Sequence, residues 1–306
     1  MWLGAHMGIA DGLAEAAVEG RKIGCDSIQI FSKSPQMWAG PPIAPAAAEA
    51  FRAAVRKEGL LATQVHHGYL ANLANPKAFL LKRSRKAFLD ELDRAELLGV
   101  DSLVFHPGAH LGGGVESGLK VLIESLRLAL EARPEGRVRI LLENAAGQGT
   151  TLCSRFEELA TVLNALDRPE RFGVNLDTCH MFAAGYDFHD AAAYGALTDH
   201  IETVLGTKRV FAFHLNDAQE DLGSRRDRHE NIGKGRIGLE AFRLIVNDPR
   251  WAKVPGYLET PLDGRGYAQY AEDLRTLRSL LPSAPVAPPK RRTRARRSAA
   301  RGSTVK

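Results

Sequence analysis

The chain has little cysteine and no long apolar run. Its three cysteines, Cys25, Cys153 and Cys179, are odd in number and have no C-x-x-C spacing, which argues against a disulfide framework and for a reducing compartment. No segment approaches the roughly 18 apolar residues of a membrane helix. The first residues, MWLGAHMGIADGLAEAA, lack the basic region of a signal peptide. We therefore expect a cytoplasmic protein with no membrane partner.

Acidic residues are missing from the C-terminal end. Residues 283–306 contain eight Lys or Arg and no Asp or Glu, so the formal charge of +5 comes from this segment and the remainder carries about −3. The segment is rich in Pro, Ala, Ser and Arg and has almost no large apolar residues, so it cannot offset the entropy of folding. We predict a disordered basic tail, which is either a solubilising extension or a nonspecific electrostatic arm for nucleic acid.

A glycine-rich phosphate turn is also missing after the first apolar run, where a doubly wound open sheet would normally show one. Eight short runs rich in Val, Ile, Leu and Phe instead alternate with stretches of helical periodicity. The runs cover residues 2–6, 27–31, 61–66, 102–106, 138–143, 172–177, 210–214 and 256–259. We predict an α/β fold, a (β/α)8 TIM barrel over residues 1–282, with seven helices between the strands and a last one over 266–281.

Seven of the eight runs end on residue types that bind metal ions. The first ends on His6, which we interpret as a supporting or structural group, and the other six are the candidate ligands. They are His66, His106, Glu143, Asp177, His214 and Glu259. In a TIM barrel the ends of the strands form the rim that carries the active site. Carboxylates and imidazoles gathered there are costly unless they are paired or coordinate cations, so the sequence predicts a metal cluster. Mixed His and carboxylate ligands suit zinc or manganese, and we interpret Cys179 as a small buried apolar residue.

Several longer motifs resemble one family. They are HHGYLANL (66–73), FHPGAH (105–110), LLENAAGQGT (141–150), DTCHMFAAGYD (177–187), HLNDAQEDLGSRRDRHENIGKG (214–235) and LET (258–260). In this order and number they resemble endonuclease IV, the zinc-dependent apurinic/apyrimidinic endonuclease with a barrel fold. The resemblance covers roughly residues 2–281 and excludes the tail.

The resemblance implies three zinc ions per chain, with manganese as the alternative at some sites. The first would be held by His66, His106 and Glu143, and the second by Glu143, Asp177, His214 and Glu259. The third would be held by His180, Asp227 and His229. His66 is chosen over His67 because the family places a tyrosine, here Tyr69, three residues after the ligand.

The family activity is DNA repair. The resemblance implies hydrolysis of the phosphodiester on the 5′ side of an abasic site in duplex DNA, leaving a 3′-hydroxyl and a 5′-deoxyribose phosphate. A glutamate that bridges two metal ions suits this reaction, and we expect Glu143 to be the catalytic residue that helps to deprotonate the attacking water. A rim that must accept duplex DNA is compatible with a monomer.

The DNA contacts follow from the same resemblance. Tyr69 and Leu70 look like the family's wedge, which enters the base stack where a missing base makes unstacking cheap. Arg225 and Arg228 are candidate phosphate contacts. The family often has an arginine in the phrase FxKxxRQW, whereas this chain has Gln36 in FSKSPQMW, so we expect a weaker grip on the minor groove.

Two alternative functions fit parts of the pattern. A sugar isomerase or epimerase on the same barrel would hold a metal with Glu143, Asp177, His214 and Glu259, but it would not need the other five ligand positions. A DNA-binding protein without catalysis would act through the basic tail. Idle carboxylates near DNA would repel phosphate, which disfavours the second alternative.

Overall fold

The computed structural model describes residues 1–282, and the predicted basic tail, residues 283–306, lies outside the described residues. Eight parallel strands close into a barrel in the order β1-β10-β7-β6-β5-β4-β3-β2. These strands are β1 (Trp2–Met7), β2 (Ser27–Phe31), β3 (Ala62–His66), β4 (Ser102–Phe105), β5 (Arg139–Glu143), β6 (Phe172–Asp177), β7 (Val210–His214) and β10 (Pro255–Leu258). All eight predicted strands are confirmed, with bounds that differ by at most one residue.

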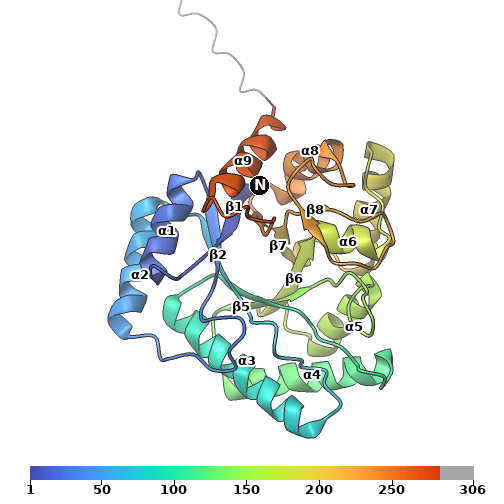
Figure 1. Cartoon of the computed structure of the whole chain (residues 1–306). Helices are drawn as coiled ribbons and strands as arrows, with labels where there is room; N and C mark the ends of the chain where they lie inside the picture. Colours follow the sequence, from blue (N-terminus) through green and yellow to red (C-terminus); the bar gives the residue numbers. More distant parts are fainter. Residues whose placement is uncertain (283–306) are drawn as a thin grey trace, which may run out of the picture.

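Helices surround the barrel (Figure 1). They are α1 (Leu13–Lys22), α2 (Pro45–Glu58), α3 (Ala78–Leu98), α4 (Val115–Ala132), α5 (Phe156–Leu166), α6 (Thr178–Ala184), α7 (Ala191–Val204), α8 (Leu239–Asn247) and α9 (Ala268–Ser279). The prediction of one helix after each strand is wrong after β6, where both α6 and α7 follow. Among residues 1–282, none of these helices is both long and apolar enough to span a membrane.

The helices form because their apolar residues recur on one face, which packs against the outside of the barrel. On α4, for example, Leu119, Leu122, Ile123 and Leu126 are buried. A smaller apolar group, Val104, Leu141, Ala212 and Tyr257, fills the inside of the barrel. The strands are thus covered on both faces, as expected for a parallel sheet, and only their C-terminal ends open onto a rim.

A short hairpin extends the rim after β7. Strands β8 (Asp217–Ala218) and β9 (His229–Glu230) pair antiparallel across a ten-residue connection, residues 219–228. The hairpin lies beside α6 (Figure 1). The hairpin therefore brings a loop of the rim next to the helix α6, and the candidate site contains residues from both.

Candidate metal centre

The residues at the strand ends meet on the rim. His66, Glu143, Asp177 and His214 are the last residues of their strands and are fully buried, while His106 and Glu259 directly follow β4 and β10. Because parallel strands of a closed barrel all end on one side, residues far apart in sequence come within reach of one another.

The first predicted ligand set is assembled around one oxygen of Glu143. His66 Nε2 lies 3.3 Å and His106 Nε2 lies 3.6 Å from Glu143 Oε2. Zinc binds nitrogen and oxygen ligands at about 2.0–2.2 Å, so two atoms on one tetrahedral ion lie about 3.3–3.6 Å apart. Each histidine thus lies at a distance from Glu143 that a shared ion allows. Within 4.8 Å, however, the ligand atoms of His66 group with those of Glu143, His214 and Glu259, whereas His106 belongs to no such group among the described residues.

The second set is assembled around His214. Its Nδ1 lies 2.9 Å from Glu143 Oε1, 3.3 Å from Glu259 Oε2 and 3.7 Å from Asp177 Oδ2. Glu143 therefore presents one carboxylate oxygen to each of the first two sets. This is the arrangement that a bridging carboxylate requires.

The third set comes from a helix and a hairpin. His180 lies on α6, where Asp177 caps the helix by accepting the backbone N–H of His180 at 2.8 Å. Asp227 lies between His180 and His229, with Oδ2 3.1 Å from His180 Nε2 and Oδ1 3.2 Å from His229 Nε2. The resemblance alone predicted this grouping, because none of the three residues lies on a barrel strand.

A second hydrogen bond orients most of these imidazoles. Nδ1 of His66, His180 and His229 donates to a backbone carbonyl, that of His67, Asn144 and Glu259 respectively, at 2.8, 2.8 and 3.1 Å. Since a carbonyl only accepts, Nδ1 carries a proton and Nε2 is the nitrogen that faces the cluster and is available to a metal ion. His214 is reversed, because its Nε2 donates to Gln29 Oε1 at 2.9 Å and its Nδ1 faces the cluster.

Several ligand atoms are buried without a hydrogen-bond partner. Within residues 1–282, His66 Nε2, Glu143 Oε2 and His229 Nε2 are such atoms. Buried polar atoms of this kind are costly unless something coordinates them. Their chemistry, imidazole nitrogen and carboxylate oxygen, suits zinc ions, so the residues fit the metals that the sequence predicts.

The charges in the cluster perturb one another strongly. Burial alone would lower the pKa of His214, but the carboxylates of Glu259 and Glu143 outweigh burial and raise it to about 9. The pKa of His229 likewise rises to about 9, because Asp177 and Asp227 outweigh burial. Burial would raise the pKa of Asp227, but His180 and His229 hold it far below its usual range. Metal ions would have to displace protons from these imidazoles.

The predicted wedge lies beside the cluster. Tyr69 is 63% exposed and Leu70 is 40% exposed, and Tyr69 lines a cavity of about 160 Å³ together with His106, Asp227 and Glu259. Gln36 is exposed on the neighbouring loop after β2. The two loops touch, since a Cβ on Gly68 would lie 2.8 Å from the carbonyl oxygen of Pro35.

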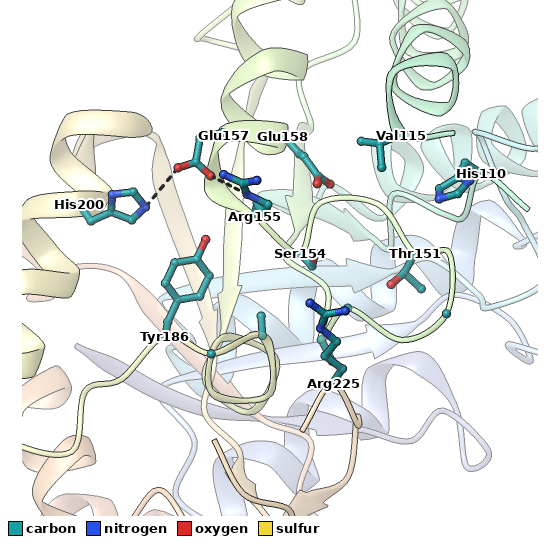
Figure 2. A pocket seen from close by; sticks show the side chains of 15 residues that line it. His110, Val115, Thr151, Ser154, Arg155, Glu157, Glu158, Tyr186, His200 and Arg225 are labelled. Carbon is teal, nitrogen blue, oxygen red and sulfur yellow. Dashed lines mark ion pairs between the residues drawn. The ribbon is translucent and has the colours of Figure 1, made fainter. Parts of the chain in front are cut away.

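The two predicted arginine contacts differ in position. Arg225 lines a separate cavity of about 490 Å³ between the loops after β5 and β6, and its side chain points toward Ser154 (Figure 2). Its φ of 55° is uncommon for a residue with a side chain. Arg228 instead donates from Nη1 to the carbonyl of Asp227 at 2.6 Å. Arg225 therefore lines a cavity whose wall contains none of the proposed metal ligands.

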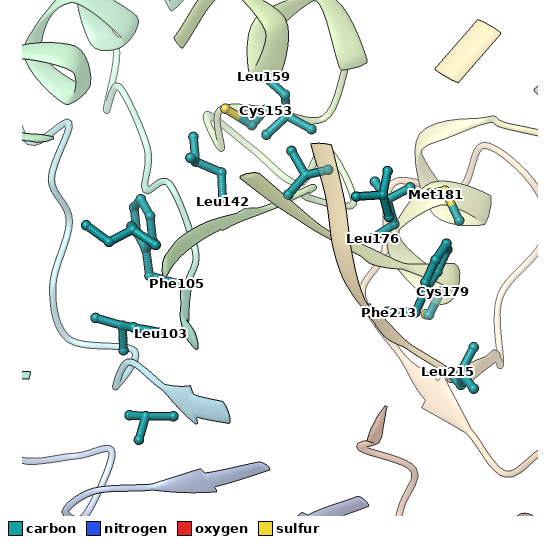
Figure 3. Close-up of a cluster of buried hydrophobic side chains, with 14 of the residues drawn as sticks. Leu103, Phe105, Leu142, Cys153, Leu159, Leu176, Cys179, Met181, Phe213 and Leu215 are labelled. Carbon is teal, nitrogen blue, oxygen red and sulfur yellow. The ribbon is translucent and has the colours of Figure 1, made fainter. Parts of the chain in front are cut away.

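Cys179 packs among apolar side chains that include Met181, Leu176 and Phe213 (Figure 3). Burial raises the pKa of its thiol to about 12, and Sγ donates to the carbonyl of Arg228 at 3.5 Å. Its sulfur lies near Asp177 and His229, but a protonated thiol is a poor metal ligand. The structure therefore agrees with its interpretation as a small buried apolar residue.

Sequence reasoning missed two glutamines inside the barrel, Gln29 and Gln64, which lie close to the ligands. Gln29 Nε2 donates to Glu259 Oε1 at 2.5 Å, while its Oε1 accepts from both His214 and Gln64 Nε2. His6 lies within 3.4 Å of Glu259. The available signal was a glutamine in the middle of two otherwise apolar runs, SIQIF and LATQVH. Such a residue must find a partner in the barrel interior.

The fold and rim define an enzyme of the xylose isomerase-like TIM barrel class, and the family of that description matches residues 18–280. A probable endonuclease 4 of Chloroflexus aurantiacus is 46% identical over 281 residues, which are 92% of this chain and 98% of that relative. The crystal structure of endonuclease IV from Thermus thermophilus matches with a TM-score of 0.79 and 36% identity, covering 92% of this chain and 98% of that one. The chain belongs to the endonuclease IV family and, by that membership, is a nuclease.

A sugar-converting enzyme shares only the fold. A 3-keto-D-glucoside 4-epimerase from E. coli matches with a TM-score of 0.66 and 15% identity, covering 91% of this chain and 99% of that one. At this identity the similarity concerns the barrel and not the chemistry of its rim.

Proposed function

We propose that this chain is a DNA repair endonuclease that hydrolyses the phosphodiester on the 5′ side of abasic sites in duplex DNA. The products are a 3′-hydroxyl and a 5′-deoxyribose phosphate. One observation carries the proposal: His66, His106, His180, Asp227 and His229 extend the four-residue set around His214 into one continuous cluster. A sugar epimerase has no need of these five residues, whereas a phosphodiester in mid-cleavage carries negative charge on several oxygens.

Three zinc ions fit the cluster, in the ligand sets described above, with manganese as the alternative at some sites. When bound, they would activate a water for attack and neutralise charge on the attacking and leaving oxygens. Glu143 would bridge two of them and help to accept the proton of the attacking water. Its pKa lies well below the usual range, since His214 and His106 outweigh the effect of burial, so its carboxylate is ionised at neutral pH.

Recognition of the lesion would come from the rim around the cluster. Tyr69 and Leu70 are exposed apolar side chains beside the metal-facing cavity, which suits a wedge that fills the gap left by a missing base. Gln36, on the loop that touches theirs, would contact the minor groove more weakly than an arginine. Arg225 would contact a backbone phosphate beyond the cluster. Arg228 would rigidify the loop through its hydrogen bond to the Asp227 carbonyl and would bind phosphate with its remaining N–H groups.

The cellular setting follows from the same features. We place the protein in the cytoplasm as a monomer, with duplex DNA as its partner and no membrane partner. Cys25, Cys153 and Cys179 are buried free thiols, which suits a reducing compartment. A single chain supplies every proposed ligand.

The test is cleavage of a duplex that contains one tetrahydrofuran abasic analogue. The zinc-loaded chain should cut it on the 5′ side, Glu143→Ala should not, and Glu116→Gln, a control on α4 whose side chain is 86% exposed, should cut as the parent does. Zinc content should approach three ions per chain. An intact strand with three bound ions would refute the nuclease proposal, and one ion per chain with sugar epimerisation would favour the alternative enzyme.

The Arg225 contact has its own test. Each phosphate contact contributes about −0.9 to the slope of log affinity against log salt concentration. Arg225→Ala should therefore make the slope for the abasic duplex less steep by roughly one, and Arg275→Ala, on the exposed face of α9, should leave it unchanged. An unchanged slope for Arg225→Ala would remove this residue from the DNA surface.

A further inference from the structure

Two of the three residues in the third ligand set depend on a loop. His180 is held by α6, but Asp227 and His229 lie in the segment 219–237, between β8 and α8. A loop of this length has many conformations of similar free energy unless other contacts select one. The position of Asp227 and His229 therefore depends on whatever fixes this segment.

The strongest fixed point is a buried carboxylate that the proposed function does not use. Asp217 is fully buried. Its Oδ2 accepts the backbone N–H groups of Gly233 at 2.9 Å and Gly235 at 3.1 Å. Its Oδ1 accepts those of Ala218 and Ile237, both at 2.9 Å. Asp217 thus accepts four hydrogen bonds from the backbone. Hydrogen bonds from backbone N–H groups to a carboxylate are among the strong ones, and these four close the far end of the loop.

The glycines of the GKG tripeptide make this close approach feasible. A Cβ on Gly235 would lie 2.5 Å from Asp217 Oδ1 and would also overlap the carbonyl oxygen of Ala218. Gly233 has a φ of +77°, in the region that glycine adopts without strain. The backbone of the tripeptide thus surrounds the Asp217 carboxylate. This contact accounts for the two glycines without a bound phosphate.

The same residue is connected to the metal ligands through the hairpin. Asp217 and Ala218 form β8 and pair with Glu230 and His229 of β9. Gln219 N also donates to the carbonyl of Arg228 at 2.9 Å. Fixing Asp217 therefore fixes Ala218, the strand partner of His229, and with it Asp227 two residues before His229.

The near end of the loop is docked separately on α6. The backbone N–H groups of Gly223 and Arg225 donate to the carbonyls of Phe182 and Ala183, at 3.0 and 2.9 Å. The loop is thus held at both ends by contacts that involve none of the proposed ligands. From this arrangement we infer that Asp217 is a positioning residue: its carboxylate folds the loop so that Asp227 and His229 face His180 and bind the third ion. The inference rests on the proposed three-ion centre.

The test counts metal ions. Asp217→Asn keeps the shape but replaces one acceptor oxygen by an NH₂ group, so two of the four backbone donors lose their acceptor. Asp221→Asn is the matched control, because Asp221 lies on the same loop with its side chain 86% exposed. After dialysis at limiting free zinc, the parent chain and Asp221→Asn should retain three ions by elemental analysis, and Asp217→Asn should retain two. A merely structural role would not remove one ion selectively.

Gly235→Ala disturbs the same carboxylate from its other side and should also retain two ions. Circular dichroism establishes which variants fold. Three ions in folded Asp217→Asn would overturn the inference, as would loss of all ions. If Asp217→Asn does not fold, Gly235→Ala decides by the same count, and failure of both to fold would overturn the inference, because Asp217 would then hold the whole fold. Fewer than three ions in the parent chain would refute the three-ion centre, and an equal count in Asp217→Asn would then also overturn the role of Asp217.

Discussion

A buried ion pair beneath the loop after β2 makes a quantitative prediction. Lys33 and Glu91, on that loop and on α3, form an ion pair with side chains that are 5% and 1% exposed. Lys33 Nζ also lies 3.2 Å from Asp90 Oδ2. Arg94, one turn further along α3, donates to the carbonyls of Ser32 at 2.8 Å and Pro41 at 2.9 Å. The loop that carries Gln36 is therefore tied to α3 by Lys33, Glu91 and Arg94, which are buried charged residues.

Lys33→Met removes the ammonium group and leaves the Glu91 carboxylate buried beside Asp90. Breaking one side of a buried pair costs about 3–5 kcal/mol, which at about 2–4 °C per kcal/mol lowers the melting temperature by roughly 6–20 °C. Adding Glu91→Gln removes the unpaired buried charge and should restore most of the lost free energy of unfolding. Lys22→Met is the matched control, since Lys22 is 70% exposed and pairs with Glu19 across 2.9 Å. It should cost less than about 1 kcal/mol.

Urea unfolding of the zinc-loaded chain measures these free energies. Lys33→Met should also raise KM for an abasic duplex, because the loop loses its anchor, while hydrolysis of bis(p-nitrophenyl) phosphate at the metal centre should stay within about twofold. A cost for Lys33→Met as small as that for Lys22→Met would refute the reasoning. If the double variant is no more stable than Lys33→Met, the unpaired Glu91 carboxylate is not the cause of the destabilisation.

Three further predictions concern the site. Tyr69→Ala should raise KM for the abasic duplex about 5–150-fold, which is the equivalent of losing one stacked base. Phe79→Ala, at a side chain that is 77% exposed, should leave KM unchanged. Equal effects of the two substitutions in cleavage assays would contradict the wedge. Glu143→Gln should slow cleavage about 10²–10⁴-fold and reduce bound zinc, and unchanged rates would exclude its catalytic role. In the metal-free chain, the pKa values of His214 and His229, about 9, exceed the unfolded value of about 6.5. The stability they contribute is complete below about pH 6.5 and is lost as the pH rises through about 9, so the urea midpoint of the metal-free chain should fall over that range, and a constant midpoint would contradict the assignment.

The sequence determined the parts of this protein that depend on local pattern. The eight strands were found because each is a short apolar run between helical stretches, and a fully covered parallel strand must be apolar on both faces. The ligand types at the strand ends were found for the same reason, since His66, Glu143, Asp177 and His214 interrupt apolar runs where each strand stops. The helix α6 was missed because it is only seven residues long and starts directly at the cap, Asp177.

Only the tertiary structure decided how these residues face one another. Gln29 bonds His214 across 185 positions of sequence, and Lys33 pairs with Glu91 across 58. No local sequence pattern predicts which ring nitrogen of His214 faces the cluster. Nor does one predict that the loop of Asp227 and His229 folds around the Asp217 carboxylate. These contacts exist because closing the barrel brings the ends of its strands to one rim, where buried polar atoms must each find a partner or a metal ion.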